Sequence, residues 1–178
     1  MAYNFNFYAP TEVVFGKETE RKVGKLVKKQ GCNKVLLHYG GQSAERSGLL
    51  KTIRQSLDTE NIQYVELGGV VPNPRLSLVY KGIELCREEQ VDFILAVGGG
   101  SVIDSAKAIG YGMANEGDVW DFYEYTRQAD DCLPIGAVLT IAAAGSEMSD
   151  SSVITKDEGM IKRGYGNNAS RLRFAVMN

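Results

Sequence analysis

Residues 96–107 read AVGGGSVIDSAK, and this stretch carries the strongest local signal for the fold. It completes the apolar run Val91–Val97, which has the length and composition of a strand covered on both faces. Three glycines follow, and then Val102–Met113 has apolar residues at helical spacing. Glycines let the backbone approach a ligand closely, and the first amides of a helix are unpaired at its positive end. The pattern therefore predicts an anion site suited to a pyrophosphate.

A purely structural turn is the alternative interpretation. Ser101 is a good N-cap residue, and Asp104 three positions later completes the pattern of a capping box. The spacing is neither the G-x-G-x-x-G dinucleotide fingerprint nor a P-loop, because no G-K-[ST] follows. Three glycines exceed what a helix cap needs, so we favour the binding interpretation.

Strands and helices alternate along the chain. The pattern predicts an extended start at Phe5–Phe15, helices at Glu18–Gln30, Leu49–Leu57, Leu76–Glu89 and Val102–Met113, and strands at Lys34–Tyr39, Gln63–Leu67, Val91–Val97 and Ile135–Leu139. Two more short strands, Ser152–Thr155 and Leu172–Met177, are expected to be joined by a hairpin-like stretch. Alternation of this kind predicts a parallel sheet with helices on both faces. We therefore expect an α/β fold, a Rossmann-like dinucleotide-binding domain over residues 1–178 with short extra strands at both ends.

Composition narrows the classes of function. A length of 178 residues favours one domain, and a net charge of -2 gives no basic excess for nucleic acid. No apolar run is long enough to span a membrane, and the N-terminus lacks the features of a signal peptide, so we expect a soluble cytoplasmic protein. Cys32, Cys86 and Cys132 are widely spaced and predict free or buried thiols. His38 is the only histidine, so no histidine-based metal site can be completed within this chain.

A second glycine turn, Gly40-Gly41-Gln42-Ser43, follows the strand Lys34–Tyr39. In NAD-binding folds a carboxylate near the end of an equivalent strand binds the ribose hydroxyls. No Asp or Glu occurs between Lys34 and Ala44, whereas the turn amides, Ser43 and nearby Arg46 suit a phosphate. The turn therefore favours NADP over NAD, although an ordinary loop is the alternative.

With these turns placed, the chain resembles the N-terminal half of the iron-dependent (metal-containing, group III) alcohol dehydrogenases, in the butanol dehydrogenase-like branch. The similarity covers nearly all of the chain. It depends on these pieces: Phe15-Gly16, YGGQS at 39–43, GVVPNP at 69–74, the 98–107 segment and GDVWD at 117–121.

The resemblance implies a set of cofactor contacts. Gly98 to Ser101 would surround the pyrophosphate, and Asp104 and Lys107 would lie toward the nicotinamide. Asn73 would contact the adenosine side, Gly41 and Ser43 would bind the 2'-phosphate, and Lys162 would face the ribose. Further implied contacts are Thr140 and Ile141 in a threonine-rich loop, Ser149 shortly after it, and Gly99 and Gly100 inside the pyrophosphate turn.

The loop TIAAAGSE at 140–147 departs from the family pattern. Ala144 stands where the family has a threonine whose hydroxyl contacts the cofactor, and Ala143 replaces a glycine. One lost hydrogen bond costs about 1 kcal/mol, so we expect weakened binding.

The resemblance also implies an NADP-dependent alcohol dehydrogenase or aldehyde reductase, with NAD as the alternative cofactor and a small alcohol or aldehyde as substrate. The family's helical second domain binds iron or zinc through one aspartate and three histidines, which polarises the substrate oxygen. That aspartate follows the strand ending at Asn178, so we expect a chain that binds no metal and is inactive alone. A homodimer is left open.

Two other hypotheses compete with this one. The first is a stand-alone nucleotide-binding module, and the second is the cofactor domain of a glycerol dehydrogenase-like polyol oxidoreductase. An end directly after an alternating strand, at Asn178, indicates the front part of a longer enzyme. The pieces at 39–43 and 69–74 disfavour the polyol enzyme.

Overall fold

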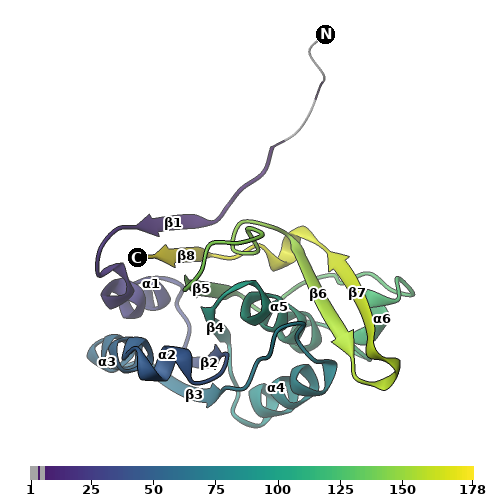
Figure 1. Cartoon of the computed structure of the whole chain (residues 1–178), viewed down its shortest axis with the longest axis horizontal. Coiled ribbons are helices and arrows are strands. Elements are labelled where there is room, and N and C mark those ends of the chain that lie inside the picture. The colour runs from purple at the N-terminus through teal and green to yellow at the C-terminus, as the bar shows by residue number, and fades with distance from the viewer. Residues whose placement is uncertain (1–3, 5–6) are drawn as a thin grey trace.

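The computed structural model describes residues 4 and 7–178 as one α/β unit (Figure 1). Its strands are β1 (Glu12–Phe15), β2 (Lys34–Tyr39), β3 (Gln63–Leu67), β4 (Phe93–Gly98), β5 (Ile135–Leu139), β6 (Ser151–Lys156), β7 (Ile161–Gly166) and β8 (Phe174–Met177). Its α-helices are α1 (Val23–Lys29), α2 (Ser43–Arg46), α3 (Leu49–Thr59), α4 (Leu76–Glu88), α5 (Gly100–Ala114) and α6 (Trp120–Tyr123).

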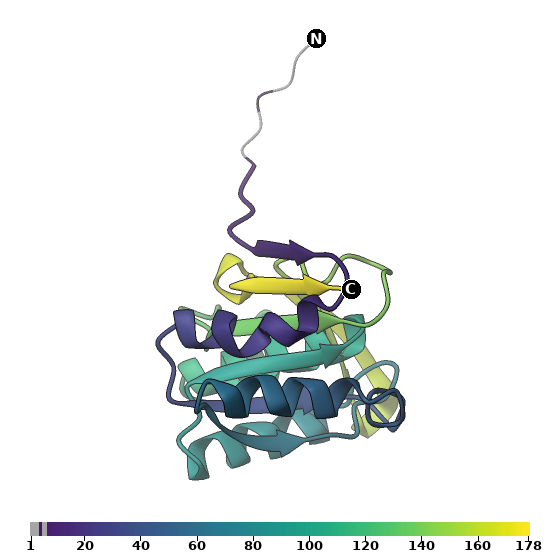
Figure 2. The same cartoon turned by 90° about the vertical axis from the view of Figure 1, so that its left-hand side faces the viewer.

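Six strands form one parallel sheet in the order β1-β8-β5-β4-β2-β3, and Figure 2 shows them stacked in that order. Helices α1 and α3 cover one face, and α4 and α5 cover the other. The predicted Rossmann-like α/β class is confirmed.

Alternation of side chains along the strands supplies both cores. In β4, Phe93, Leu95 and Val97 face α1 and α3, whereas Ile94 and Ala96 face α4 and α5. All five are fully buried, which explains why this strand reads as a continuous apolar run.

The prediction for the last strands was wrong in its pairing. Ser151–Lys156 pairs antiparallel with Ile161–Gly166, a strand that the sequence analysis did not identify, and the two form a separate hairpin. Instead of joining this hairpin, β8 enters the main sheet between β5 and β1. The exposed, polar and glycine-containing strand Ile161–Gly166 has one buried residue, Tyr165, so its sequence carries little strand signal.

The predicted helix Glu18–Gln30 is interrupted. A 3-10 turn covers Thr19–Lys22, and α1 begins only at Val23. Glu18 has a left-handed φ of 59° and breaks the helix at its predicted start. Part of the expected extended start, Phe5 and Asn6, lies outside the described residues; the strand begins at Glu12.

The predicted cap of α5 was also wrong. The helix begins at Gly100, its N-cap residue is Gly99, and no side chain caps it. Ser101 therefore lies inside the first turn, and the Asp104 carboxylate accepts a hydrogen bond from Val153 N–H on β6 at 3.1 Å. The first amides of the helix therefore have no side-chain cap.

Two predictions from composition can be compared with the structure. The three cysteines are free thiols, as predicted. Within residues 4 and 7–178, no helix has both the length and the apolar character that crossing a membrane requires.

His38 joins three elements inside the core. It is fully buried on β2; its Nδ1 lies 2.8 Å from the Leu67 carbonyl oxygen at the end of β3, and its Nε2 lies 2.9 Å from Ser105 Oγ on α5. Burial lowers the pKa of His38 to about 4 from an ordinary value of 6.5. The ring is therefore neutral at pH 7.

This histidine makes stability fall in mild acid. Below its ordinary pKa the unfolded chain takes up a proton that the folded chain does not bind until about pH 4, so folding is progressively disfavoured in that window. We expect the free energy of unfolding to fall by about 2 kcal/mol between pH 7 and pH 5 through His38 alone. Urea titrations of the wild type and His38→Gln at both pH values measure this, and an equal pH dependence of the two proteins would contradict it.

Candidate functional site

Strands β2 and β4 lie side by side, and the chain leaves them in opposite directions. From β2 it continues to β3 at one edge, and from β4 it continues to β5 on the other side. Such a reversal of strand order opens a crevice beyond the carboxyl ends of the strands, where open α/β sheets bind ligands. Tyr39 pairs with Val97 in this register, so the two glycine turns of the sequence start next to each other.

The turn after β4 is closely packed by residues that follow β5. Gly99 is extended, with φ −90° and ψ −168°, and Gly98, Gly99 and Gly100 all lie outside the left-handed region. A side chain at Gly99 would place its Cβ 2.7 Å from Ile141 Cγ2, and one at Gly100 would lie 3.1 Å from Ser146 Oγ. These glycines are therefore needed for close approach and not for a positive φ.

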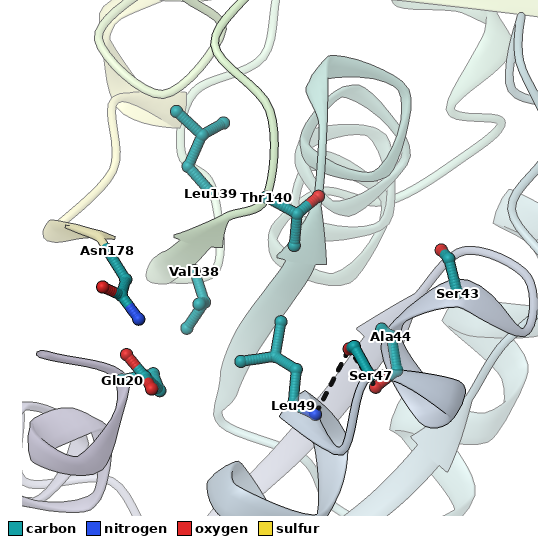
Figure 3. A pocket seen from close by; sticks show the side chains of 9 residues that line it. All are labelled: Glu20, Ser43, Ala44, Ser47, Leu49, Val138, Leu139, Thr140 and Asn178. Carbon is teal, nitrogen blue, oxygen red and sulfur yellow. Dashed lines mark hydrogen bonds between the residues drawn. The ribbon is translucent and has the colours of Figure 1, made fainter. Parts of the chain in front are cut away.

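A cavity of about 400 Å³ opens beside this turn, at the carboxyl end of β5 (Figure 3). In Figure 3, Glu20 and Asn178 stand on one side of it and the α2 residues Ser43 and Ala44 on the other. Thr140 connects the cavity to the turn because its N–H donates to the Gly98 carbonyl at 3.1 Å. Its walls combine apolar and polar side chains, as ligand pockets of this size do: Glu20, Ser43, Ala44, Ser47, Leu49, Val138, Leu139, Thr140 and Asn178.

A charged cluster borders the turn after β2, and the sequence analysis missed it. Arg54 on α3 binds Glu45 and Glu66 at 3.0 and 2.8 Å, and the Tyr39 hydroxyl donates to Glu66 at 3.1 Å. Tyr39, Glu45 and Arg54 line a second cavity, of about 510 Å³, with Gly40 and Gly41. Glu45 lies one residue after the acid-free stretch Lys34–Ala44, and Glu66 comes from the neighbouring strand β3. Their position beside Arg54 is therefore visible only in the fold.

Asn73 and Lys162 are 89 positions apart in the sequence, and the structure brings them together. The Lys162 ammonium donates to Asn73 Oδ1 at 2.7 Å. Asp104 contacts the hairpin that carries Lys162, because its carboxylate accepts from Val153 N–H on β6. Its Oδ1 atom is buried and has no hydrogen-bond partner among the described residues. Burial raises the pKa of the Asp104 carboxyl, although the Val153 N–H and the charge of Lys107 oppose the shift.

Lys107 does not face the crevice. It is fully buried, and its Nζ donates to the carbonyls of Ser146, Ser149 and Ser151 at 2.8, 2.8 and 2.9 Å. In this arrangement both Lys107 and the Ser149 carbonyl are already paired with protein groups. The contacts proposed for them by resemblance stay predictions.

The fold thus groups most of the predicted positions around the two turns. Those at the turns and the adjoining cavity are Gly41, Ser43, Gly98, Gly99, Gly100, Ser101, Thr140 and Ile141, while Asn73, Asp104 and Lys162 lie toward the β6–β7 hairpin. Among the side chains that the structure describes, no three potential ligands of the His, Cys, Asp and Glu types gather as a metal site would require.

This geometry defines the class: a Rossmann-like α/β domain whose parallel sheet reverses its strand order between β2 and β4. The family model for iron-containing alcohol dehydrogenase matches residues 10–178, and the chain belongs to that family. The resemblance seen in the sequence is therefore confirmed.

Relatives agree with this assignment. The chain is 49% identical over 175 residues to the probable NADH-dependent butanol dehydrogenase 2 of Bacillus subtilis, covering 98% of this chain and 45% of that protein. It is 32% identical to the NADPH-dependent aldehyde reductase of Escherichia coli, with coverage of 98% and 45%. A crystal structure of NADH-dependent butanol dehydrogenase A from Thermotoga maritima superposes with a TM-score of 0.96 at 42% identity, covering 98% of this chain and 44% of that one. The chain thus spans somewhat less than half the length of these relatives.

The space at Gly99 can be tested by filling it. We expect Gly99→Val to abolish cofactor binding because a branched side chain at the N-cap position of α5 would block access to the first amides of the helix. Since that side chain also meets Ile141, the substitution is placed in an Ile141→Ala background, where melting should stay near the background value. Thermal melting and NADPH titration measure both effects.

Ser101→Ala tests whether this residue contributes to the stability of α5. Because Ser101 makes no capping bond, its stability should change by no more than about 0.5 kcal/mol. Unchanged NADPH affinity in the Gly99→Val/Ile141→Ala protein, relative to Ile141→Ala, would place the site elsewhere.

Proposed function

We propose that this chain is the cofactor-binding part of an NAD(P)H-dependent alcohol dehydrogenase or aldehyde reductase acting on a primary alcohol or aldehyde. The observation that carries the proposal is the juxtaposition of two glycine turns at the carboxyl ends of β2 and β4, with a cavity opening beside them. Membership of the iron-containing alcohol dehydrogenase family supports it.

The residues present fit a dinucleotide. No side chain caps the first amides of α5, which suit the pyrophosphate. The cavity lined by Leu49, Val138 and Thr140 suits the adenosine portion, because it joins apolar walls with hydroxyl groups. A bound nicotinamide would supply or accept the hydride, while the protein supplies binding and orientation.

The proposal includes a division of labour between domains. Residues 1–178 form a single dinucleotide-binding domain, and a helical domain outside this chain supplies the iron or zinc ligands and most of the substrate pocket. This is consistent with the chain covering 45% of the Bacillus subtilis relative. The metal then polarises the substrate oxygen in the longer protein.

We further propose that NADPH is preferred over NADH. Ser43 and Arg46 are exposed at the turn after β2, and no side chain lies within 4 Å of a Cβ at Gly41, so the turn has room for a 2'-phosphate. Glu45 opposes this preference, but its charge is compensated by Arg54. The relatives include proteins named for either cofactor, so the choice is open to measurement.

Titration of the chain with NADPH and NADH is expected to give tighter binding of NADPH. Ser43→Asp should weaken NADPH binding at least about fivefold, since a carboxylate near the phosphate costs roughly 1 kcal/mol or more. Gln55→Asp, which adds the same charge at an exposed position of α3, is the matched control. Equal affinities in the wild type, or an equal effect of both substitutions, would contradict the preference.

The chain by itself is expected to show no alcohol oxidation or aldehyde reduction. Its only histidine is the buried His38, and the described residues bring no set of metal ligands together. The assay uses butanol or butyraldehyde, both cofactors and added iron or zinc. Turnover above the blank would contradict the division of labour, whereas cofactor binding without turnover supports it. A chain that binds neither cofactor would contradict the proposed function as a whole.

A further inference from the structure

The loop of residues 140–150, here called the covering loop, joins β5 to β6 and lies against the glycine turn. The N–H of Thr140 donates to the Gly98 carbonyl, and Ile141 and Ser146 occupy the space that side chains at Gly99 and Gly100 would need. The covering loop therefore forms one wall of the crevice in which the pyrophosphate is proposed to bind.

Lys107 anchors this wall from inside the protein. A lysine is almost never fully buried without a partner, and here the three N–H donors of the ammonium match three carbonyls that converge on it. Two of the carbonyls, those of Ser146 and Ser149, belong to the covering loop, and the third belongs to Ser151 directly after it. The ammonium thus links the covering loop and the first residue of β6 to α5.

The hydrogen bonds from the Lys107 ammonium to the three carbonyls are charge-assisted. Charge-assisted hydrogen bonds are about twice as strong as neutral ones, and removal of the ammonium would leave several main-chain carbonyls unpaired. Asp104, one turn earlier on α5, binds Val153 N–H, so the same helix face holds the start of β6. Arg171 adds a second clamp by donating to the Met148 carbonyl at 2.8 Å.

We propose that Lys107 is a positioning residue whose ammonium holds the covering loop on the glycine turn and so preforms the cofactor site, without itself touching the cofactor. The inference depends on the proposed function for its ligand. It differs from the contact implied by resemblance, because the lysine acts through the carbonyls of Ser146, Ser149 and Ser151.

The charged groups around Lys107 allow a test by pH. Burial lowers its pKa to about 8, and Asp104 on the same helix and Asp150 in the covering loop partly oppose this shift. Cys132, before β5, has its pKa raised by burial, and the positive charge of Arg171, before β8, adds to the lowering of the Lys107 pKa. Lys107 is therefore the group in this cluster that loses its charge just above neutral pH.

The first experiment compares the wild type with Lys107→Met, which keeps the length of the side chain and removes the charge. We expect NADPH affinity to fall about tenfold or more, and amide exchange in residues 141–150 to accelerate while β4 and α3 keep their protection. Lys107→Arg, which keeps the charge, should restore part of both. Lys51→Met, at an exposed position of α3, is the matched control and should behave as the wild type.

The NADPH affinity of the wild type, measured as a function of pH, tests the proposal even if Lys107→Met does not fold. NADPH affinity should decrease above about pH 8, toward tenfold per pH unit, because binding then requires uptake of one proton. Lys107→Arg should remove this slope.

Three results separate the hypotheses. If the wild type binds neither NADPH nor NADH, the proposed function fails and this inference fails with it. If the wild type binds but a folded Lys107→Met keeps both its affinity and its loop protection, only the inference is overturned. A flat wild-type affinity profile above pH 8 overturns it as well.

Discussion

The parallel pairing of β2 with β4 is the constraint on which the site depends. Because Tyr39 is in register with Val97, each strand ends at the same edge and delivers its glycine turn to the same crevice. Helix α5 then starts from that edge, and no side chain caps its first amides. Shifting either strand by one residue would also exchange its two buried faces, and both faces of β4 are fully buried. The cores on the two sides of the sheet therefore fix the position of the turns.

Buried polar groups connect this sheet to the segments above it. His38 ties β2 to the end of β3 and to α5, while Asp104 and Lys107 tie α5 to the strand and loop that follow β5. Each group is costly to bury unless it is paired, so each specifies one arrangement of its neighbours. Helix α5 is consequently both a wall of the core and the support of the crevice.

Several elements were predictable because their signals are local. The strands Lys34–Tyr39 and Ile135–Leu139 were predicted with the observed bounds, since buried parallel strands read as apolar runs between turn residues. The bounds of the partly exposed edge strand Gln63–Leu67 were also predicted correctly. The strand Ile161–Gly166 was missed because Tyr165 is its one buried residue, so its sequence lacks the apolar alternation of a half-buried strand. The cap at Ser101 was predicted wrongly because Asp104, its expected partner, is recruited by Val153 from a distant part of the chain.

The sequence by itself determined the alternation of strands and helices, the two glycine turns and the family, because these depend on residue type and spacing along the chain. Only the tertiary structure decided which side chains surround the turns. Arg54 reaches the turn after β2 from α3 and binds Glu66 of β3. Asn73 meets Lys162, and Lys107 points into the covering loop and not into the crevice. Such contacts join residues far apart in sequence, and their partners are set by strand order and by the cost of leaving a buried charge unpaired.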